Sequence, residues 1–185
     1  MSRGREAAPR PVTLPPPLPW QIEFADALVA GGASVAAVVP DSRLDGIVSH
    51  AGASGLTVRT LAREEACVAY AAGQRITGMR PVVLMQCSGI GNALNALGSL
   101  AIPYGLGIPL VLSMRGTLGE SNPAQVPMGR ATPALLAALG IQAFWLRDAR
   151  ELERVVRGAL TLAYDAEATA AILLGPELEG GRERG

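Results

Sequence analysis

The chain has 185 residues, 49% of them hydrophobic, which is enough for one α/β domain with a full core. Its 16 basic and 16 acidic residues cancel in charge and the basic ones are scattered, which argues against a nucleic-acid or membrane partner and favours a small-molecule site. The absence of lysine excludes a Walker-type phosphate loop and a lysine Schiff base in this chain, and one histidine, His50, is too few for a histidine-rich metal site.

The sequence divides into two tails and one folded domain. Residues 1–18, in which arginines lie among prolines, and residues 177–185, rich in glycine and charge, are predicted to be flexible. Residues 19–176 form the expected domain. No stretch has the length of a membrane span or the apolar core of a signal peptide, and two cysteines are too few for a disulfide framework. These features predict a cytoplasmic protein.

Helical and buried-strand patterns alternate from Trp20 onward. Apolar residues at helical spacing predict a first helix that ends at Gly31, and the apolar run at 34–39, stopped by Pro40, predicts a strand buried on both faces. The same reasoning predicts strands at 56–61, 81–86, 109–113, 144–146 and 168–174, and helices at 42–51, 64–77, 91–101, 133–139 and 149–164, with a long loop after 113. This alternation predicts a doubly wound α/β domain, a mostly parallel six-stranded sheet with helices on both faces.

Polar or glycine-rich loops follow the first four predicted strands, at the sheet edge where α/β proteins bind ligands. Each loop alone has a structural explanation, because Pro-Asp-Ser is a good turn and helix cap, and two acids at a helix start interact favourably with its dipole. The loops are Val39-Pro40-Asp41-Ser42-Arg43-Leu44, Arg63-Glu64-Glu65, Gln86-Cys87-Ser88-Gly89-Ile90-Gly91-Asn92, and Met114-Arg115-Gly116 with the segment 119–129.

The glycine loop also suggests a dinucleotide site, which would make this a nucleotide-binding α/β protein. Leu94 stands where the third glycine of that fingerprint belongs, and the loop follows the third strand instead of the first. Both departures disfavour a nicotinamide cofactor.

Taken in order, the loops resemble a known family. The motifs Val-Pro-Asp-Ser, Arg-Glu-Glu with Gly73 nine residues after Glu64, Met-Gln-Cys-Ser-Gly-Ile-Gly-Asn-Ala-Leu-Asn and Pro-Ala-Gln-Val-Pro-Met-Gly are similar to the pyrimidine-binding (PYR) domain of thiamine-diphosphate-dependent 2-oxoacid decarboxylases. Within this family the resemblance is greatest to sulfopyruvate decarboxylase alpha subunits, and next to phosphonopyruvate decarboxylases. It covers residues 20–175 and implies a thiamine-diphosphate-binding fold.

The resemblance assigns cofactor contacts. The spacing to Gly73 selects Glu64 as the catalytic residue, which hydrogen-bonds a ring nitrogen of the cofactor's aminopyrimidine, and leaves Glu65 to cap the helix. Apolar neighbours such as Val68 and Ala71 are expected to shield Glu64 from water and strengthen that bond. The loop after the third strand is expected to pack along the pyrimidine through Cys87, Ser88, Gly89 and Asn92. Cys87 stands where asparagine is expected.

The resemblance also assigns substrate contacts to Asp41, Ser42, Gln86 and Arg115. Asp41 keeps an alternative role as a helix cap. A sulfonate or phosphonate group suits arginine, whose planar fork donates two parallel hydrogen bonds, so Arg115 and Arg43 are the candidate anion ligands, with Gln125 as a neutral partner.

Family members hold Mg²⁺ and the cofactor's diphosphate in a second domain through a Gly-Asp-Gly motif, which this sequence lacks. The resemblance therefore implies a separate beta subunit that supplies Mg²⁺, no metal ligand in this chain, and an α₂β₂ assembly with a homodimer contact. The expected substrate is a short anionic 2-oxoacid, 3-sulfopyruvate or alternatively 3-phosphonopyruvate. A non-catalytic PYR-like binding module is the third alternative.

Overall fold

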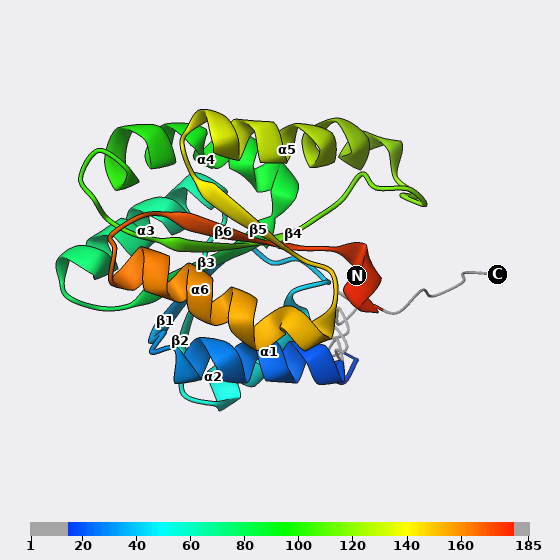
Figure 1. Ribbon diagram of the computed structural model, residues 1–185, viewed down its shortest axis with the longest axis horizontal. Coiled ribbons are helices and arrows are strands. Elements are labelled where there is room, and N and C mark those ends of the chain that lie inside the picture. Colours follow the sequence, from blue (N-terminus) through cyan, green and yellow to red (C-terminus); the bar gives the residue numbers. More distant parts are fainter. Residues whose placement is uncertain (1–14, 180–185) are drawn as a thin grey trace, which may run out of the picture.

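The computed structural model describes residues 15–179, so residues 1–14 and 180–185 of the tails predicted at 1–18 and 177–185 lie outside this range (Figure 1). Six strands form one parallel sheet in the order β2-β1-β3-β4-β6-β5, which confirms the predicted doubly wound sheet. The strands are β1 (Val35–Val38), β2 (Thr57–Thr60), β3 (Pro81–Gln86), β4 (Pro109–Ser113), β5 (Gln142–Leu146) and β6 (Ala170–Leu174).

Three helices cover each face of the sheet (Figure 1). Successive strand residues point to opposite faces, so Val82 and Leu84 pack in one core while Val83 and Met85 pack in the other. Both faces are therefore apolar, as the unbroken hydrophobic runs predicted. One face carries α1 (Pro19–Ala30), α2 (Asp45–Ala53) and α6 (Leu152–Tyr164), and the other carries α3 (Glu64–Ile76), α4 (Ile90–Ala96) and α5 (Val126–Ala138).

The predicted start of α5 at residue 133 is wrong. A 3₁₀ turn, Pro123–Gln125, leads directly into a helix that begins at Val126 and includes Pro133. Proline favours the first turn of a helix because its missing N–H would have no partner there, and Pro127 occupies such a position. Pro127 is therefore compatible with the start of a helix in a segment that was predicted to be a long loop.

The residues at both ends of the described range pack on the domain. The backbone N–H of Leu18 donates to Gln21 Oε1 (2.8 Å) ahead of α1. After β6, Pro176–Glu179 forms a 3₁₀ helix whose Leu178 is buried. The predicted domain limits of 19 and 176 remain predictions. Between residues 15 and 179, no helix combines the length and the apolar character needed to cross a membrane.

Candidate active site at the carboxyl edge of the sheet

The sheet reverses its direction of winding between β1 and β3. The chain leaves β1 for the edge strand β2 and returns to pair β3 on the other side of β1, where Val38 lies beside Leu84. Ligands of open α/β sheets bind in the crevice at such a point, outside the carboxyl ends of the strands. The loops that follow β1 and β3 hold most of the candidate residues, so the fold gathers them at one edge.

Glu64 is the first residue of α3 and lies against the glycine loop. Asn92 Nδ2 donates a hydrogen bond to Glu64 Oε2 (2.8 Å), which joins two residues predicted to contact the cofactor. A Cβ atom placed on Gly89 would lie 2.4 Å from Glu64 Cγ, so only glycine allows this approach. Within the described residues, Glu64 Oε1 accepts no hydrogen bond. One carboxyl oxygen is fixed, and the other remains available to a ligand.

The neighbouring acid has a different role. Glu65 accepts a hydrogen bond from Arg63 Nε, which lowers the pKa of Glu65. Arg63 is the N-cap residue of α3 and no side chain caps the helix there, so the expected cap by Glu65 is replaced by an ion pair. Val68 and Ala71 are fully buried, but Glu64 itself stays partly exposed in this chain. The apolar shielding expected around Glu64 is therefore incomplete.

The loop after β3 separates into buried and accessible parts. Cys87 is fully buried, its carbonyl oxygen lies 3.0 Å from Thr132 Oγ1 of α5, and burial raises the pKa of its thiol. Ser88 and Gly89 follow in a single 3₁₀ turn that leads into α4. The thiol of Cys87 thus belongs to the core, and the ring contacts expected of this loop stay a prediction.

Asp41 connects the loops after β1 and β4. Its Oδ2 accepts a hydrogen bond from Arg115 Nη2 (2.7 Å), and its Oδ1 accepts from Ser113 Oγ (3.2 Å) and the Arg43 backbone N–H (2.9 Å). The side chains of Asp41 and Arg115 are only 7% and 16% exposed. Leu44 is the N-cap residue of α2, so Asp41 does not cap that helix. The predicted substrate residues Asp41 and Arg115 are close together, but Arg115 already holds the carboxylate.

Gln86 lies at the end of β3, apart from these hydrogen bonds. Its Nε2 donates to Gln125 Oε1 (2.8 Å), and its Oε1 accepts from Ser88 Oγ (3.2 Å). Gln125 is the N-cap residue of α5. The two glutamines predicted near the substrate therefore join the loop after β3 to the start of α5.

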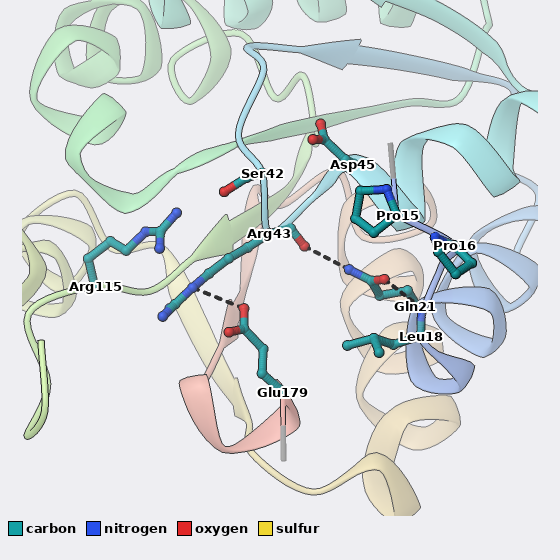
Figure 2. Close-up of a pocket in the computed structure, with 10 residues that line it drawn as sticks. Pro15, Pro16, Leu18, Gln21, Ser42, Arg43, Asp45, Arg115 and Glu179 are labelled. Carbon is teal, nitrogen blue, oxygen red and sulfur yellow. Dashed lines mark hydrogen bonds and ion pairs between the residues drawn. The ribbon is translucent and has the colours of Figure 1, made fainter. Parts of the chain in front are cut away.

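A cavity of about 270 Å³ opens beside Arg43 and Arg115 (Figure 2). Arg43 Nε pairs with Glu179 Oε1 (3.0 Å), and Arg43 Nη1 donates to the carbonyl oxygen of Met114 (2.7 Å). Figure 2 shows the Ser42 side chain directed toward the guanidinium of Arg115. The walls are formed by Pro15, Pro16, Leu18, Gln21, Ser42, Arg43, Asp45, Gly46, Arg115 and Glu179.

Sequence reasoning missed three polar residues of this cavity: Gln21, Asp45 and Glu179. Gln21 Nε2 donates to the Arg43 carbonyl oxygen (3.0 Å). Burial and the charge of Asp41 raise the pKa of Asp45. Glu179 is more than 130 positions from Arg43 in a segment predicted to be flexible, so no local sequence pattern could predict that the two residues pair. No group of three or more potential metal-ligating side chains occurs in the part of the chain that the structure describes.

The fold matches a known class of enzyme. A solved structure of a 2-oxoglutarate:ferredoxin oxidoreductase from Magnetococcus marinus, with 2-oxoglutarate, coenzyme A and succinyl-CoA bound, superposes on 84% of this chain with a TM-score of 0.64 and 13% identity. This chain spans only 28% of that protein chain. No family model matches the sequence. The fold is the pyrimidine-binding type of thiamine-diphosphate-dependent enzymes, as the sequence resemblance implied.

Sequence relatives identify the family. Sulfopyruvate decarboxylase subunit alpha from Methanothermobacter thermautotrophicus is 33% identical over 159 residues, which are 83% of this chain and 96% of that protein. The subunit alpha from Methanococcus maripaludis is 38% identical over 112 residues, 60% of this chain and 67% of that protein. A sulfopyruvate decarboxylase from Methanosarcina acetivorans is 34% identical over 110 residues, but these are 28% of its length. The chain belongs to the family of sulfopyruvate decarboxylase alpha subunits.

Proposed function

We propose that this chain is the alpha subunit of a thiamine-diphosphate-dependent decarboxylase. It acts on 3-sulfopyruvate, which takes up one proton and yields sulfoacetaldehyde and CO₂. The observation that carries the proposal is the alignment with 96% of a sulfopyruvate decarboxylase alpha subunit, in a chain that presents Glu64 at the ligand-binding edge of the sheet.

The residues around Glu64 fit an aminopyrimidine ring. Gly89 has no side chain at the point where any Cβ would meet Glu64, so the carboxyl group can lie against the backbone of this loop. Oε1 of Glu64 is available to a ring nitrogen, while Asn92 fixes Oε2. A flat ring with a nitrogen at its edge suits this combination of a glycine loop and a carboxyl group held on one side.

In this proposal Glu64 shares a proton with the ring nitrogen, and Asn92 holds the carboxyl group in the orientation that the proton transfer needs. Thiamine diphosphate, when bound, supplies an electron sink for the electron pair left by CO₂. Arg115 and Asp41 fix the shape of the loops after β4 and β1 through their 2.7 Å ion pair, so that Ser42 stays exposed at the site.

A second subunit completes the proposed enzyme. The relatives from M. maripaludis and M. thermautotrophicus are named as alpha subunits, which supports a partner subunit that holds Mg²⁺ and the diphosphate. The proposed beta subunit supplies both, in an α₂β₂ assembly that places the cofactor between the two chains. Cys67 and Cys87 are free thiols, which suits the proposed cytoplasmic location.

Reconstitution tests this function. The chain is co-purified with its beta subunit and assayed with Mg²⁺ and thiamine diphosphate on 3-sulfopyruvate, 3-phosphonopyruvate and pyruvate. We expect CO₂ release that requires the cofactor and is fastest with 3-sulfopyruvate. Faster turnover of 3-phosphonopyruvate would make that compound the substrate. Faster turnover of pyruvate would show that Arg43 and Arg115 do not bind an anionic group of the substrate. An inactive assembly that still binds the cofactor would indicate a binding module.

A further inference from the structure

Two arginines line this cavity, and each is paired with an acid of this chain. Arg43 Nε pairs with Glu179 Oε1 at 3.0 Å, and Arg115 Nη2 pairs with Asp41 Oδ2 at 2.7 Å. The pairs differ in how firmly they are held. Asp41 is 7% exposed and accepts two further hydrogen bonds, whereas the Glu179 side chain is 33% exposed and lies at the end of a 3₁₀ helix.

One donor of Arg115, beneath the surface of this cavity, has no acceptor. Arg115 Nε is buried and makes no hydrogen bond within residues 15–179, although Arg115 lines the cavity. A buried donor without a partner costs about 1–3 kcal/mol, so a ligand that makes the Arg115 side chain turn this group to an acceptor in the cavity gains affinity. A carboxylate has two oxygens to offer, and a sulfonate has three. A sulfonate can therefore pair with Arg43 and still present an oxygen toward Arg115.

We propose that the Glu179 carboxylate occupies the place of the substrate's sulfonate, and that the sulfonate displaces it to bind Arg43 and Arg115. This inference rests on the proposed function and adds the residues that select the substrate. Glu179 is then an internal substitute for the anionic end of the substrate. It keeps Arg43 paired while the site is empty, and competes with every anion that enters.

The charges around the cavity favour a monoanion. A sulfonate carries one negative charge, so its exchange with the Glu179 carboxylate leaves the charge of the cavity unchanged. Asp45 lines the same cavity and Asp41 lies behind Arg115, so a more negative group meets repulsion. A phosphonate has a second ionisable proton and gains a second negative charge when it loses that proton, whereas a sulfonate has no second proton to lose. The cavity should therefore prefer sulfonates to phosphonates.

Calorimetry on the complete alpha–beta assembly tests the inference, with sulfoacetate and phosphonoacetate as probes. Glu179→Gln keeps the size of the side chain but removes the competing charge, so the Kd for sulfoacetate should fall by about fivefold. Arg43→Gln should raise this Kd by at least about tenfold, because it removes a charged donor. Wild-type assembly should bind phosphonoacetate more weakly than sulfoacetate.

Glu177→Gln is the matched control. Glu177 lies in the same 3₁₀ helix and pairs with Arg147 on the surface, outside the cavity. Its variant should bind sulfoacetate as wild type does. Thermal unfolding of each variant shows whether Arg43→Gln weakens sulfoacetate binding by destabilising the fold. Glu179→Gln does not need that control, because its expected effect is tighter binding.

The possible results separate the inference from the proposed function. Equal Kd values for wild type and Glu179→Gln, an equal gain in the Glu177 variant, or no sulfoacetate binding by any of the proteins would overturn the inference. If 3-sulfopyruvate is still decarboxylated in that case, the proposed function stands without it. If no decarboxylation occurs but Glu179→Gln tightens sulfoacetate binding, the anion site stands and the proposed reaction is wrong.

Discussion

Adjacent residues in this site have unequal roles because their surroundings differ. Glu64 and Glu65 both lie in the first turn of α3, but only Glu64 contacts the glycine loop, through Asn92 and the backbone of Gly89. Glu65 pairs with Arg63 on the surface. A hydrogen bond to one carboxyl oxygen orients the group, whereas an exposed ion pair contributes little. The two acids should therefore respond differently to the same substitution.

Glu64→Gln in the alpha–beta assembly should reduce cofactor-dependent decarboxylation by about 10²–10⁴-fold, because the amide cannot exchange a proton with a ring nitrogen. The matched Glu65→Gln substitution should leave the rate within about twofold, as expected for an exposed ion pair. Steady-state assays on 3-sulfopyruvate measure both. A Glu64→Gln assembly with wild-type activity would show that the catalytic assignment is wrong.

Gly89→Ala should disturb Glu64 directly. The new Cβ would lie 2.4 Å from Glu64 Cγ, so the carboxyl group must move, and a displacement near 1 Å costs about 100-fold in rate. Gly91→Ala is the control, since its Cβ would meet only the flexible end of Met128, at 3.1 Å. Thiamine diphosphate affinity and turnover of the two assemblies should separate them. Equal losses would indicate a general effect on the glycine loop.

At the scale of elements, α5 determines the shape of the site from outside the sheet edge. Gln125, in the 3₁₀ turn directly before α5, accepts a hydrogen bond from Gln86. Further along α5, the hydroxyl of Thr132 lies close to the carbonyl oxygen of Cys87. The loop after β3 is thus held from two positions of one helix. A loop was predicted up to residue 132, and only the structure shows that the helix already begins at Val126.

Thr132→Val should weaken this contact without changing the shape of the side chain. Thr132 is fully buried, and its hydroxyl lies 3.0 Å from the Cys87 carbonyl oxygen and 2.8 Å from that of Met128. The loss should lower the free energy of unfolding by about 1–3 kcal/mol, since a buried carbonyl loses a donor. Urea denaturation measures it. The exposed Thr161→Val should change stability by less than about 0.5 kcal/mol, and an equal loss there would remove this explanation.

At the scale of the whole molecule, buried acids of high pKa make the fold sensitive to alkali. Burial, together with the charges of Glu64 and Glu65, raises the pKa of Cys67 from 9.0 to about 12. Burial also raises the pKa of Cys87 and of Tyr164, which packs beneath Arg75 and Arg80. These groups stay protonated in the folded state at a pH where the unfolded chain has already lost the protons.

Above pH 7.5 the free energy of unfolding should therefore stay constant to about pH 8 and then fall as the pH rises from 9 towards 12, by about 1.4 kcal/mol per pH unit for Cys67, with a further decline from Cys87 and, above about pH 10, from Tyr164. Urea denaturation at pH 7.5, 9 and 10.5 measures the slope. Cys67→Ala removes one of these groups and should make the decline shallower. A stability that stays flat between pH 9 and 10.5 would contradict the predicted protonation of the buried thiols.

The sequence by itself determined the order and type of the elements and the parallel sheet, while the choice of Glu64 as catalytic residue came from the family resemblance and stays a prediction. The elements and the sheet follow from local patterns: unbroken apolar runs require a strand covered on both faces, and loops after parallel strands meet at one edge. Only the tertiary structure decided which partners those residues have. Three contacts join distant positions. Asn92 and Glu64 are 28 residues apart and Arg115 and Asp41 are 74 apart. Arg43 and Glu179 are more than 130 residues apart. Such contacts depend on how loops pack at the sheet edge, which no periodicity along the chain records.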